Sequence, residues 1–161
     1  MPAAELPYRP CVGIMLVNRR GLVFVGQRRH MTTPAWQMPQ GGIDPGESPA
    51  DAARRELREE TGAEHAEILA ESRQWHSYDL PQPLIGKVWG GAFRGQTQKW
   101  FLLLFQGADS DFELGGEEGE FASWRWLDPA QLTQMIVPFK RPIYQAVLAE
   151  FKPLIDTLVK G

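Results

Sequence analysis

Apolar and polar positions follow one another along this chain in a way that predicts several short strands. Residues 11–17 and 22–26 form two apolar runs, and the sequence Asn-Arg-Arg-Gly that joins them is typical of a hairpin turn. The run at residues 100–106 has the length of a strand and predicts one that is buried on both faces. Residues 121–127 alternate well enough to predict a further strand.

Three other segments have weaker patterns. Residues 67–78 have strand character, although their alternation is imperfect. Residues 81–99 contain two prolines and four glycines, so we expect them to be largely loop. Residues 109–120 are acidic and rich in glycine, which favours an exposed loop.

Helix signals frame residues 49–61. Ser48 is a suitable N-cap, Pro49 fits the first helical position, and Gly62 is a natural stop. We expect Gly41 and Gly42 to let the backbone turn tightly before this helix, because glycine tolerates conformations that other residues avoid.

Apolar residues recur at helical spacing between residues 143 and 158 and predict a C-terminal helix. Pro153 lies inside it and is expected to kink or split the helix, because proline has no N–H to donate. Asp128 and Pro129 predict a shorter helix before it by the same N-cap logic. Strands and helices are mixed along the chain, so the fold class is α/β or α+β.

Composition limits the possible classes of protein. The 161 residues suffice for one domain, over 1–161, and are too few for two. Hydrophobic residues make up 43% and charged residues 23%, a balance that excludes a disordered chain. The net charge of -3 argues against broad binding of nucleic acid, so we expect no DNA partner. It leaves room for a phosphorylated end recognised by a local basic cluster.

Cys11 is the sole cysteine, so no internal disulfide can form, and a reducing compartment such as the cytoplasm is expected. Because Cys11 begins an apolar run, we expect a small buried hydrophobe rather than a nucleophile. That run is too short to span a membrane, and Glu5 precedes it where a signal peptide would be basic. We therefore expect no signal peptide and no membrane-spanning segment.

Three glutamates carry the main chemical signal. At about 100° per residue, Glu56, Glu59 and Glu60 share one face of the predicted helix. Their mutual repulsion is unfavourable unless a cation lies in front of them, and oxygen ligands suit a hard divalent ion. The alternative is a solvated acidic face with partners such as an Arg55–Glu59 pair.

The residues around these glutamates resemble the Nudix box. From Gly41 the chain reads GGIDPGESPADAARRELREETGA, and the fixed or class positions of the box fall on Gly41, Glu47, Arg55, Glu56, Leu57, Glu59, Glu60 and Gly62. The box spans 41–63, and its last aliphatic position is Ala63, which is smaller than usual. The resemblance implies the Nudix fold, an α/β/α sandwich with a mixed sheet. We expect Arg55 to point away from the carboxylate face and to pair with Glu47 as a structural brace.

The resemblance extends to residues 8–10, 36–42, 95–101, 120–126 and 139–141. These segments are similar to the bacterial RNA pyrophosphohydrolase and dinucleoside polyphosphate hydrolase branch of the Nudix family. That branch implies metal-dependent hydrolysis of phosphoanhydride bonds. Its substrates are 5'-triphosphorylated RNA or a dinucleoside polyphosphate such as diadenosine tetraphosphate, which is cleaved asymmetrically. An extended RNA is slightly disfavoured by the net charge, and the oligomeric state is not readable from the sequence.

The resemblance also implies a set of site residues. One to three Mg²⁺ or Mn²⁺ ions would bind Glu56, Glu59, Glu60, Glu120 and Gly41, with Glu59 as the general base. Positive and polar contacts to phosphates would come from Arg9, Arg28, Gln98, Lys99 and Lys140. Tyr78 and Phe139 would hold a base, since every base offers a face for stacking. Phe139 has a competing interpretation, which is packing under the last helix.

Two questions stay open at this level. Residues 81–94, which include Trp89 and Arg94, match the branch poorly and either shape substrate choice or merely cover the sheet edge. The domain is either the hydrolase described above or a catalytically silent Nudix-like module that holds a nucleotide. A silent module is expected to lose box carboxylates, and this chain keeps all of them.

Overall fold

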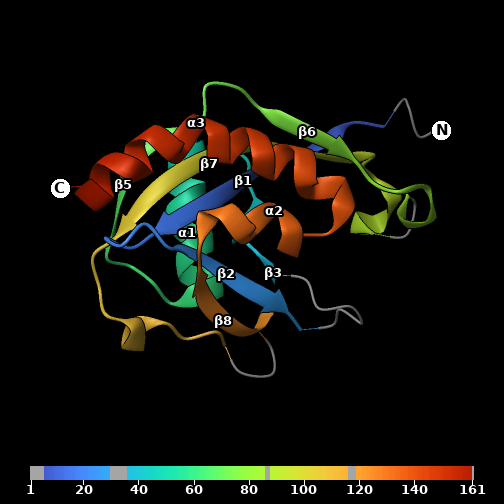
Figure 1. Cartoon of the computed structure of the whole chain (residues 1–161). Coiled ribbons are helices and arrows are strands. Elements are labelled where there is room, and N and C mark those ends of the chain that lie inside the picture. Colours follow the sequence, from blue (N-terminus) through green and yellow to red (C-terminus); the bar gives the residue numbers. More distant parts are fainter. Residues whose placement is uncertain (1–5, 30–35, 86–87, 116–118, 161) are drawn as a thin grey trace.

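The apolar runs of the sequence become the central strands of a mixed sheet (Figure 1). The computed structural model describes residues 6–29, 36–85, 88–115 and 119–160. Its strands are β1 (Tyr8–Val17), β2 (Val23–Arg28), β3 (Trp36–Gln37), β4 (Gln40–Gly42), β5 (Ala66–Glu71), β6 (His76–Asp79), β7 (Gly95–Phe105) and β8 (Phe121–Leu127). β1 and β7 pair in parallel, with Tyr8 opposite Gly95 and Val17 opposite Leu104.

The strands follow the order β3–β2–β1–β7–β5. Three further strands attach to this path: β4 pairs with β1, β6 with β7, and β8 with β2. These pairings and those of β2 and β5 with their neighbours are antiparallel. The sheet is therefore mixed, as the sequence predicts.

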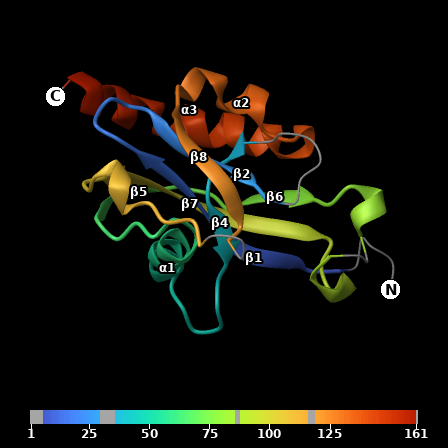
Figure 2. The same cartoon turned by 90° about the horizontal axis from the view of Figure 1, so that it is seen from below.

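Helices cover both faces of the sheet. Figure 2 shows α1 (Pro49–Thr61) on one face and α2 (Leu132–Met135) with α3 (Arg141–Lys160) on the other. The expected α/β/α sandwich is confirmed. Short 3-10 turns lie at Gln82–Leu84, Trp89–Gly91, Asp109–Asp111, Pro129–Gln131 and Pro138–Lys140.

Strand alternation divides the apolar residues between two cores. On the α1 face, Ile14 and Leu16 of β1 pack with Phe101 and Leu103 of β7 and with Leu57 of the helix. On the α3 face, the neighbouring residues of the same strands pack with the apolar side of α3: Met15, Val17, Trp100, Leu102, Tyr144 and Phe151. Both faces of β1 and β7 are buried, which explains their nearly continuous apolar sequences.

Helix α1 has the bounds that its end signals predict. The Ser48 hydroxyl accepts a hydrogen bond from the backbone N–H of Asp51 at 3.1 Å. Gly62 adopts the left-handed conformation, with φ of 78°, and its N–H donates to the Arg58 carbonyl. These two caps fix where the helix starts and stops, and so they fix which carboxylates share a face.

Several expectations need correction. Residues 67–78 form two strands, β5 and β6, that are separated by a turn, and β7 begins at Gly95 rather than at Trp100. The prolines and glycines of 81–99 predict loop, but residues 95–99 form a strand because β1 and β6 pair with it on either side and bury Gln96 and Gln98. Pro153 does not split α3, because it lies on the exposed side, where the carbonyl that loses its donor can meet water. Within the part of the chain that the structure describes, no helix combines the length and apolarity needed to cross a membrane.

Candidate active site

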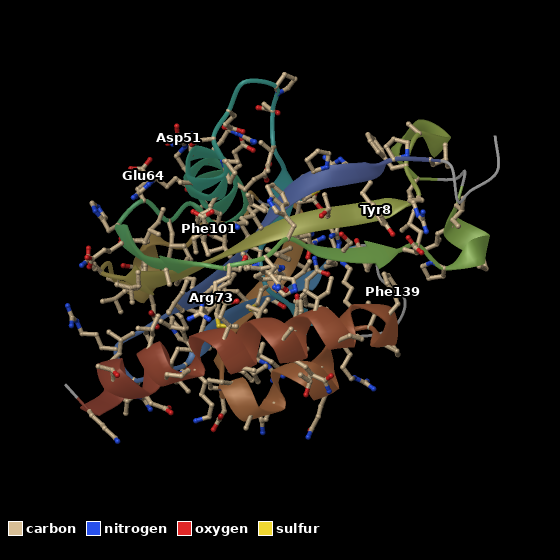
Figure 3. All side chains as sticks on the ribbon, turned by 90° about the horizontal axis from the view of Figure 1, so that it is seen from above. Tyr8, Asp51, Glu64, Arg73, Phe101 and Phe139 are labelled. Atoms are coloured by element: carbon tan, nitrogen blue, oxygen red, sulfur yellow. The ribbon has the colours of Figure 1, made fainter. Side chains whose placement is uncertain are left out.

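A cavity of about 630 Å³ opens where α1, β4 and β6 approach the segment that leads into α3. Its walls contain charged, amide, glycine and apolar residues: Arg9, Arg28, Gln37, Gln40, Gly41, Gly42, Glu56, Glu59, Glu60, Tyr78, Leu80, Leu84, Val88, Gln96, Glu120, Val137, Phe139 and Lys140. One group of these residues is carboxylate-rich and comes from the box helix and Glu120. The other is aromatic and aliphatic and includes Phe139, which Figure 3 shows at the start of α3, on the sheet face opposite α1.

Gly41 and Gly42 make room for charged side chains. Both lie in strand β4 and neither has a positive φ, so the expected glycine turn is wrong. A Cβ atom on Gly41 would lie 2.0 Å from the carboxyl carbon of Glu56, and one on Gly42 would lie 2.6 Å from an Arg9 guanidinium nitrogen. The two glycines therefore leave room for the ends of these side chains, and a larger residue would displace them.

Glu60 is the carboxylate with the most unfavourable surroundings. Burial, together with the nearby carboxylates of Glu56 and Glu120, raises its pKa well above the ordinary value. Arg28 and a backbone group of Gln40 oppose this effect only in part. Burial also raises the pKa of Glu56, partly offset by Arg55. The site thus concentrates more negative charge than its own cations balance.

Arg55 braces the box and also reaches the carboxylate face. Its Nε and Nη2 donate to the two carboxylate oxygens of Glu47 at 2.8 and 2.9 Å, which is the predicted pair. Nη2 also donates to the Gly42 carbonyl at 2.8 Å. The expectation that Arg55 points away from the other glutamates is wrong, because Nη1 donates to Glu56 at 2.8 Å and to Glu59 at 3.1 Å. The Arg55 side chain therefore makes both the brace to Glu47 and the i,i+4 ion pair to Glu59.

This network has electrostatic consequences for Glu47. The Arg55 hydrogen bonds and the backbone N–H of Asp44 lower the pKa of Glu47 to about 2. Glu47 therefore stays ionised across the working range of pH. The loop before α1 is tied to the helix by a pair of charges that does not titrate.

Glu120 comes from the start of β8 and faces the box helix across the cavity. Its carboxylate accepts a hydrogen bond from Arg28 Nη2 at 2.7 Å. Across the described ranges, which omit 30–35, 86–87 and 116–118, no three His, Cys, Asp or Glu side chains stand in a geometry that could hold a metal ion. Glu56 and Glu59 turn towards Arg55, and Glu120 towards Arg28. A cation would compete with these arginines for the same oxygens.

Lys140 lies between the two groups of residues. It is buried, with 9% of its surface exposed, and its Nζ lies 5.8 Å from the ring centre of Tyr78 and 5.9 Å from that of Phe139. Burial and the charge of Arg28 lower its pKa to about 8, while Cys11 and Glu60 act in the opposite direction. Lys140 thus places its charged Nζ beside two aromatic rings and within the field of the Glu60 carboxylate.

Tyr78 and Phe139 stand next to each other in the cavity wall. Their ring centres are 5.5 Å apart at 47°. Tyr78 is 9% exposed, and burial places the pKa of its hydroxyl above the usual range. Phe139 also packs against the core below α3, so both interpretations of this residue describe part of its environment.

Two predicted contact residues do not line the cavity. Gln98 is buried behind it, donates to Gln96 and Gln40, and accepts from the Trp100 indole N–H. Lys99 lies near Glu71, 3.6 Å away, and near the ring of Trp75. Strand alternation separates it from Gln98, so the polar run of β7 supplies only Gln96 to the cavity.

Several lining residues were missed by sequence reasoning. The amides of Gln37, Gln40 and Gln96 all line the cavity. The sequence does contain a signal for these amides, because they lie in the segments 36–42 and 95–101, which resemble the family. The apolar wall formed by Leu80, Leu84, Val88 and Val137 had no such signal.

Comparisons with known proteins add relatives for this chain. A NUDIX domain matches residues 7–147. An RNA pyrophosphohydrolase of Novosphingobium aromaticivorans (strain ATCC 700278 / DSM 12444 / CCUG 56034 / CIP 105152 / NBRC 16084 / F199) is 59% identical over 156 residues, covering 94% of this chain and 97% of that protein. An RNA pyrophosphohydrolase of Roseobacter denitrificans (strain ATCC 33942 / OCh 114) is 58% identical and covers 92% of this chain and 94% of its own length.

Similarity among solved structures concerns the fold alone. The E. coli dihydroneopterin triphosphate pyrophosphohydrolase superposes with a TM-score of 0.71 at 19% identity, covering 89% of this chain and 96% of that one. A C. elegans Ap4A hydrolase superposes with a TM-score of 0.65 at 18% identity, covering 90% and 98% of the two chains. The mixed sheet between helices is thus shared with proteins of very different sequence.

Proposed function

Because this chain belongs to the Nudix family and is a pyrophosphohydrolase of that family, we propose that it removes pyrophosphate from the triphosphorylated 5' end of RNA. The relatives named for this activity match nearly the whole chain. A dinucleoside polyphosphate is the second candidate, because it offers the same combination of a base, a ribose and a run of phosphates.

Divalent ions are general in this family, and the donor chemistry of the cavity suits them, provided that the carboxylates turn away from Arg28 and Arg55 to reach an ion. Its donors are carboxylate oxygens, which suit Mg²⁺ or Mn²⁺. The raised pKa of Glu60 marks a place where negative charge lacks a full counter-charge. We propose that Glu56, Glu59, Glu60 and Glu120 hold one to three such ions, with Gly41 leaving the space that the Glu56 carboxylate needs. When bound, the ions neutralise the polyphosphate and acidify the attacking water.

The protein's own residues align the substrate. We propose that Arg9 and Lys140, which line the cavity, bind the phosphates and that Arg28 joins them once it leaves Glu120. Tyr78 and Phe139 offer ring faces to a base. Glu59 acts as general base, since it is the most exposed of the box carboxylates that line the cavity. Lys99 and Gln98 take no part in these contacts, because they lie outside the cavity wall.

The proposed substrate also indicates the cellular compartment. The sole cysteine, Cys11, is free and buried, which suits a reducing compartment. RNA with a new 5' end is found in the bacterial cytoplasm, and we propose that compartment for the activity.

The observation that carries the proposal is one cavity that joins crowded carboxylates to an aromatic wall. The test compares kcat/KM for a 5'-triphosphorylated oligoribonucleotide and for diadenosine tetraphosphate in one Mg²⁺ buffer. We expect the RNA to be preferred. A preference for diadenosine tetraphosphate would select the second candidate, and release of neither pyrophosphate nor phosphate would contradict both.

A further inference from the structure

Three residues that follow β6 supply an apolar wall to the cavity. Leu80, Leu84 and Val88 all line it. Leu80 is 7% exposed and Val88 packs against the core, whereas Leu84 is 37% exposed. A segment that only covered a sheet edge would turn its large apolar side chains inwards. Leu84 instead presents an apolar surface at the cavity.

The two ends of the segment from Leu80 to Arg94 are held together by the backbone. The N–H of Leu80 donates to the Arg94 carbonyl at 2.8 Å, and the N–H of Arg94 donates to the Pro7 carbonyl at 3.0 Å. The adjoining Gly95 pairs with Asp79. A Cβ on Gly95 would lie 1.9 Å from the Tyr78 carbonyl oxygen, so this approach requires glycine.

A cluster of three side chains fastens the same point. Arg94 donates from Nε and Nη2 to the two oxygens of Asp79, at 2.9 and 3.0 Å. Its guanidinium carbon lies 4.8 Å from the ring centre of Tyr8. The Tyr8 hydroxyl donates a hydrogen bond to the Asp79 carboxylate, which raises the pKa of Tyr8, and hydrogen bonds from Arg94 and Tyr8 lower the pKa of Asp79. We call Tyr8, Asp79 and Arg94 the clamp.

The clamp lies outside the cavity but next to its aromatic wall. Asp79 directly follows Tyr78 in β6, and alternation turns the two side chains to opposite faces, Tyr78 buried and Asp79 exposed. None of the clamp side chains lines the cavity. Their effect on a ligand would therefore pass through the position of Tyr78 and of the apolar wall.

We propose that Leu84 and Val88 contact the base of a bound nucleotide, and that the clamp positions them. The inference rests on the proposed function, which supplies the nucleotide. Apolar side chains offer a phosphate neither charge nor hydrogen bonds, whereas they can pack against the flat face of a base beside Tyr78 and Phe139. On this proposal Leu84 and Val88 favour ligands that carry a base over ligands that carry phosphates alone.

The experiment separates base binding from phosphate binding. In a Glu59→Gln background, which we expect to prevent turnover, calorimetry measures the Kd of ATP and of inorganic tripolyphosphate with Mg²⁺. Leu84→Asn and Arg94→Gln are each expected to weaken ATP binding about tenfold, on the scale of one stacked base, and to leave tripolyphosphate unchanged. The control is Lys152→Gln, which removes an exposed ion pair with Asp156 on α3 and should change neither Kd.

Other outcomes would overturn the proposal. Equal weakening of both ligands by Leu84→Asn would mean that the wall supports the whole cavity, and no change in either would mean that it covers the sheet edge. For the clamp, the exchange Asp79→Arg with Arg94→Asp should restore ATP binding that Arg94→Gln loses. Failure of that rescue, in a protein with unchanged melting temperature, would remove the clamp from the proposal.

These outcomes remain readable if the proposed function fails. Pyrophosphate release from RNA is measured separately with the unmodified enzyme. A wild-type enzyme that ignores RNA but still binds ATP more tightly than tripolyphosphate would leave the role of the wall standing.

Discussion

The carboxylate and aromatic groups of the cavity are assembled in different ways. The carboxylate group is mostly local: Glu56, Glu59 and Glu60 come from one helix between its two caps, Gly41 precedes that helix by a few residues, and Glu120 alone among these carboxylates comes from a distant strand end. The aromatic group is assembled from residues far apart in the chain, at Tyr78, Leu84, Val88 and Phe139. Chemistry that depends on fixed spacing is thus encoded locally, whereas selection of a base depends on how distant segments pack.

The two groups also differ in their electrostatics. The carboxylates repel one another and raise the pKa of Glu60, so this region is incomplete without added positive charge. Around Tyr78 and Phe139 burial instead lowers the pKa of Lys140 to about 8. One region is organised to receive cations and the other to exclude water from a flat ring.

The largest effect is expected at the carboxylates. Glu60→Gln should lower kcat at least roughly 100-fold, because it removes a charged ligand at the reacting centre. The same change should raise the melting temperature of the metal-free protein at neutral pH. A carboxyl with a raised folded pKa costs stability above its unfolded pKa, and that cost disappears as pH falls below about 4.

Thermal melts and Mn²⁺ titrations at pH 7 and pH 4 check this prediction. Glu64→Gln, at an exposed position beyond the end of α1, is the matched control and should change neither kcat nor metal affinity. Unchanged turnover in Glu60→Gln at saturating Mg²⁺ would remove Glu60 from the site.

A smaller loss is expected from Gly41→Ala. The new methyl group would displace the Glu56 carboxylate, since it would lie 2.0 Å from the carboxyl carbon. A misplacement of about 1 Å costs on the order of 100-fold in rate, so we expect a loss between 10- and 100-fold, together with weaker Mn²⁺ binding.

Gly46→Ala provides the contrast for that measurement. Gly46 has φ of 80° and no atom within 4 Å of a Cβ there. The Gly46→Ala variant should therefore have a lower melting temperature, because of backbone strain, and an unchanged affinity for Mn²⁺. If both variants lost metal affinity equally, the close approach at Gly41 would not be the cause.

The pH dependence of stability tests the role of Lys140, which lies between the two regions. Its folded pKa of about 8 lies below the unfolded value near 10.4, so its burial costs roughly 3 kcal/mol at neutral pH. That cost declines as pH rises from 8 to 10, because the unfolded chain then binds more protons. Lys140→Met should therefore stabilise the metal-free protein at pH 7 and lose this advantage by pH 10, as followed by urea unfolding.

The same variant should weaken substrate binding. KM for triphosphorylated RNA is expected to rise in Lys140→Met at pH 7, and the wild-type KM should rise towards the same value above pH 8. A wild-type KM that is flat from pH 7 to pH 9 would contradict a phosphate contact by Lys140.

The smallest effect is expected at the aromatic wall. Phe139→Leu keeps an apolar side chain but removes a ring face, and should raise KM for nucleotides about tenfold with little change in kcat. Steady-state kinetics at saturating Mg²⁺ measure kcat and KM separately. A large fall in kcat would mean that the two regions are not separable.

The sequence predicts these two regions unequally. Helix α1 and its glutamates follow from caps and spacing, and the structure places them as expected. Gln98 and Lys99 show where such reasoning ends, because a polar run in a strand does not reveal which side chain faces a cavity. Gln98 is satisfied by Gln96, Gln40 and Trp100, and only the folded sheet brings Gln40 beside it.

Glycines give the second lesson. Their positions in the box are visible in the sequence, but their physical reason is not. A turn and a close approach both require glycine, and only the position of the Glu56 carboxylate distinguishes them at Gly41. The apolar wall of Leu84 and Val88 was not predictable, because nothing in its local pattern indicates a ligand.

The parallel pairing of β1 with β7 affects how the enzyme is made. It joins residues 8–17 to residues 95–104, and the cavity also needs Phe139 and Lys140. During synthesis the box helix leaves the ribosome long before these partners exist. Contacts that span so much of the chain form late in folding. A chain that has emerged only as far as the box therefore carries all its box glutamates but lacks the strand partner and the cavity residues that complete the site.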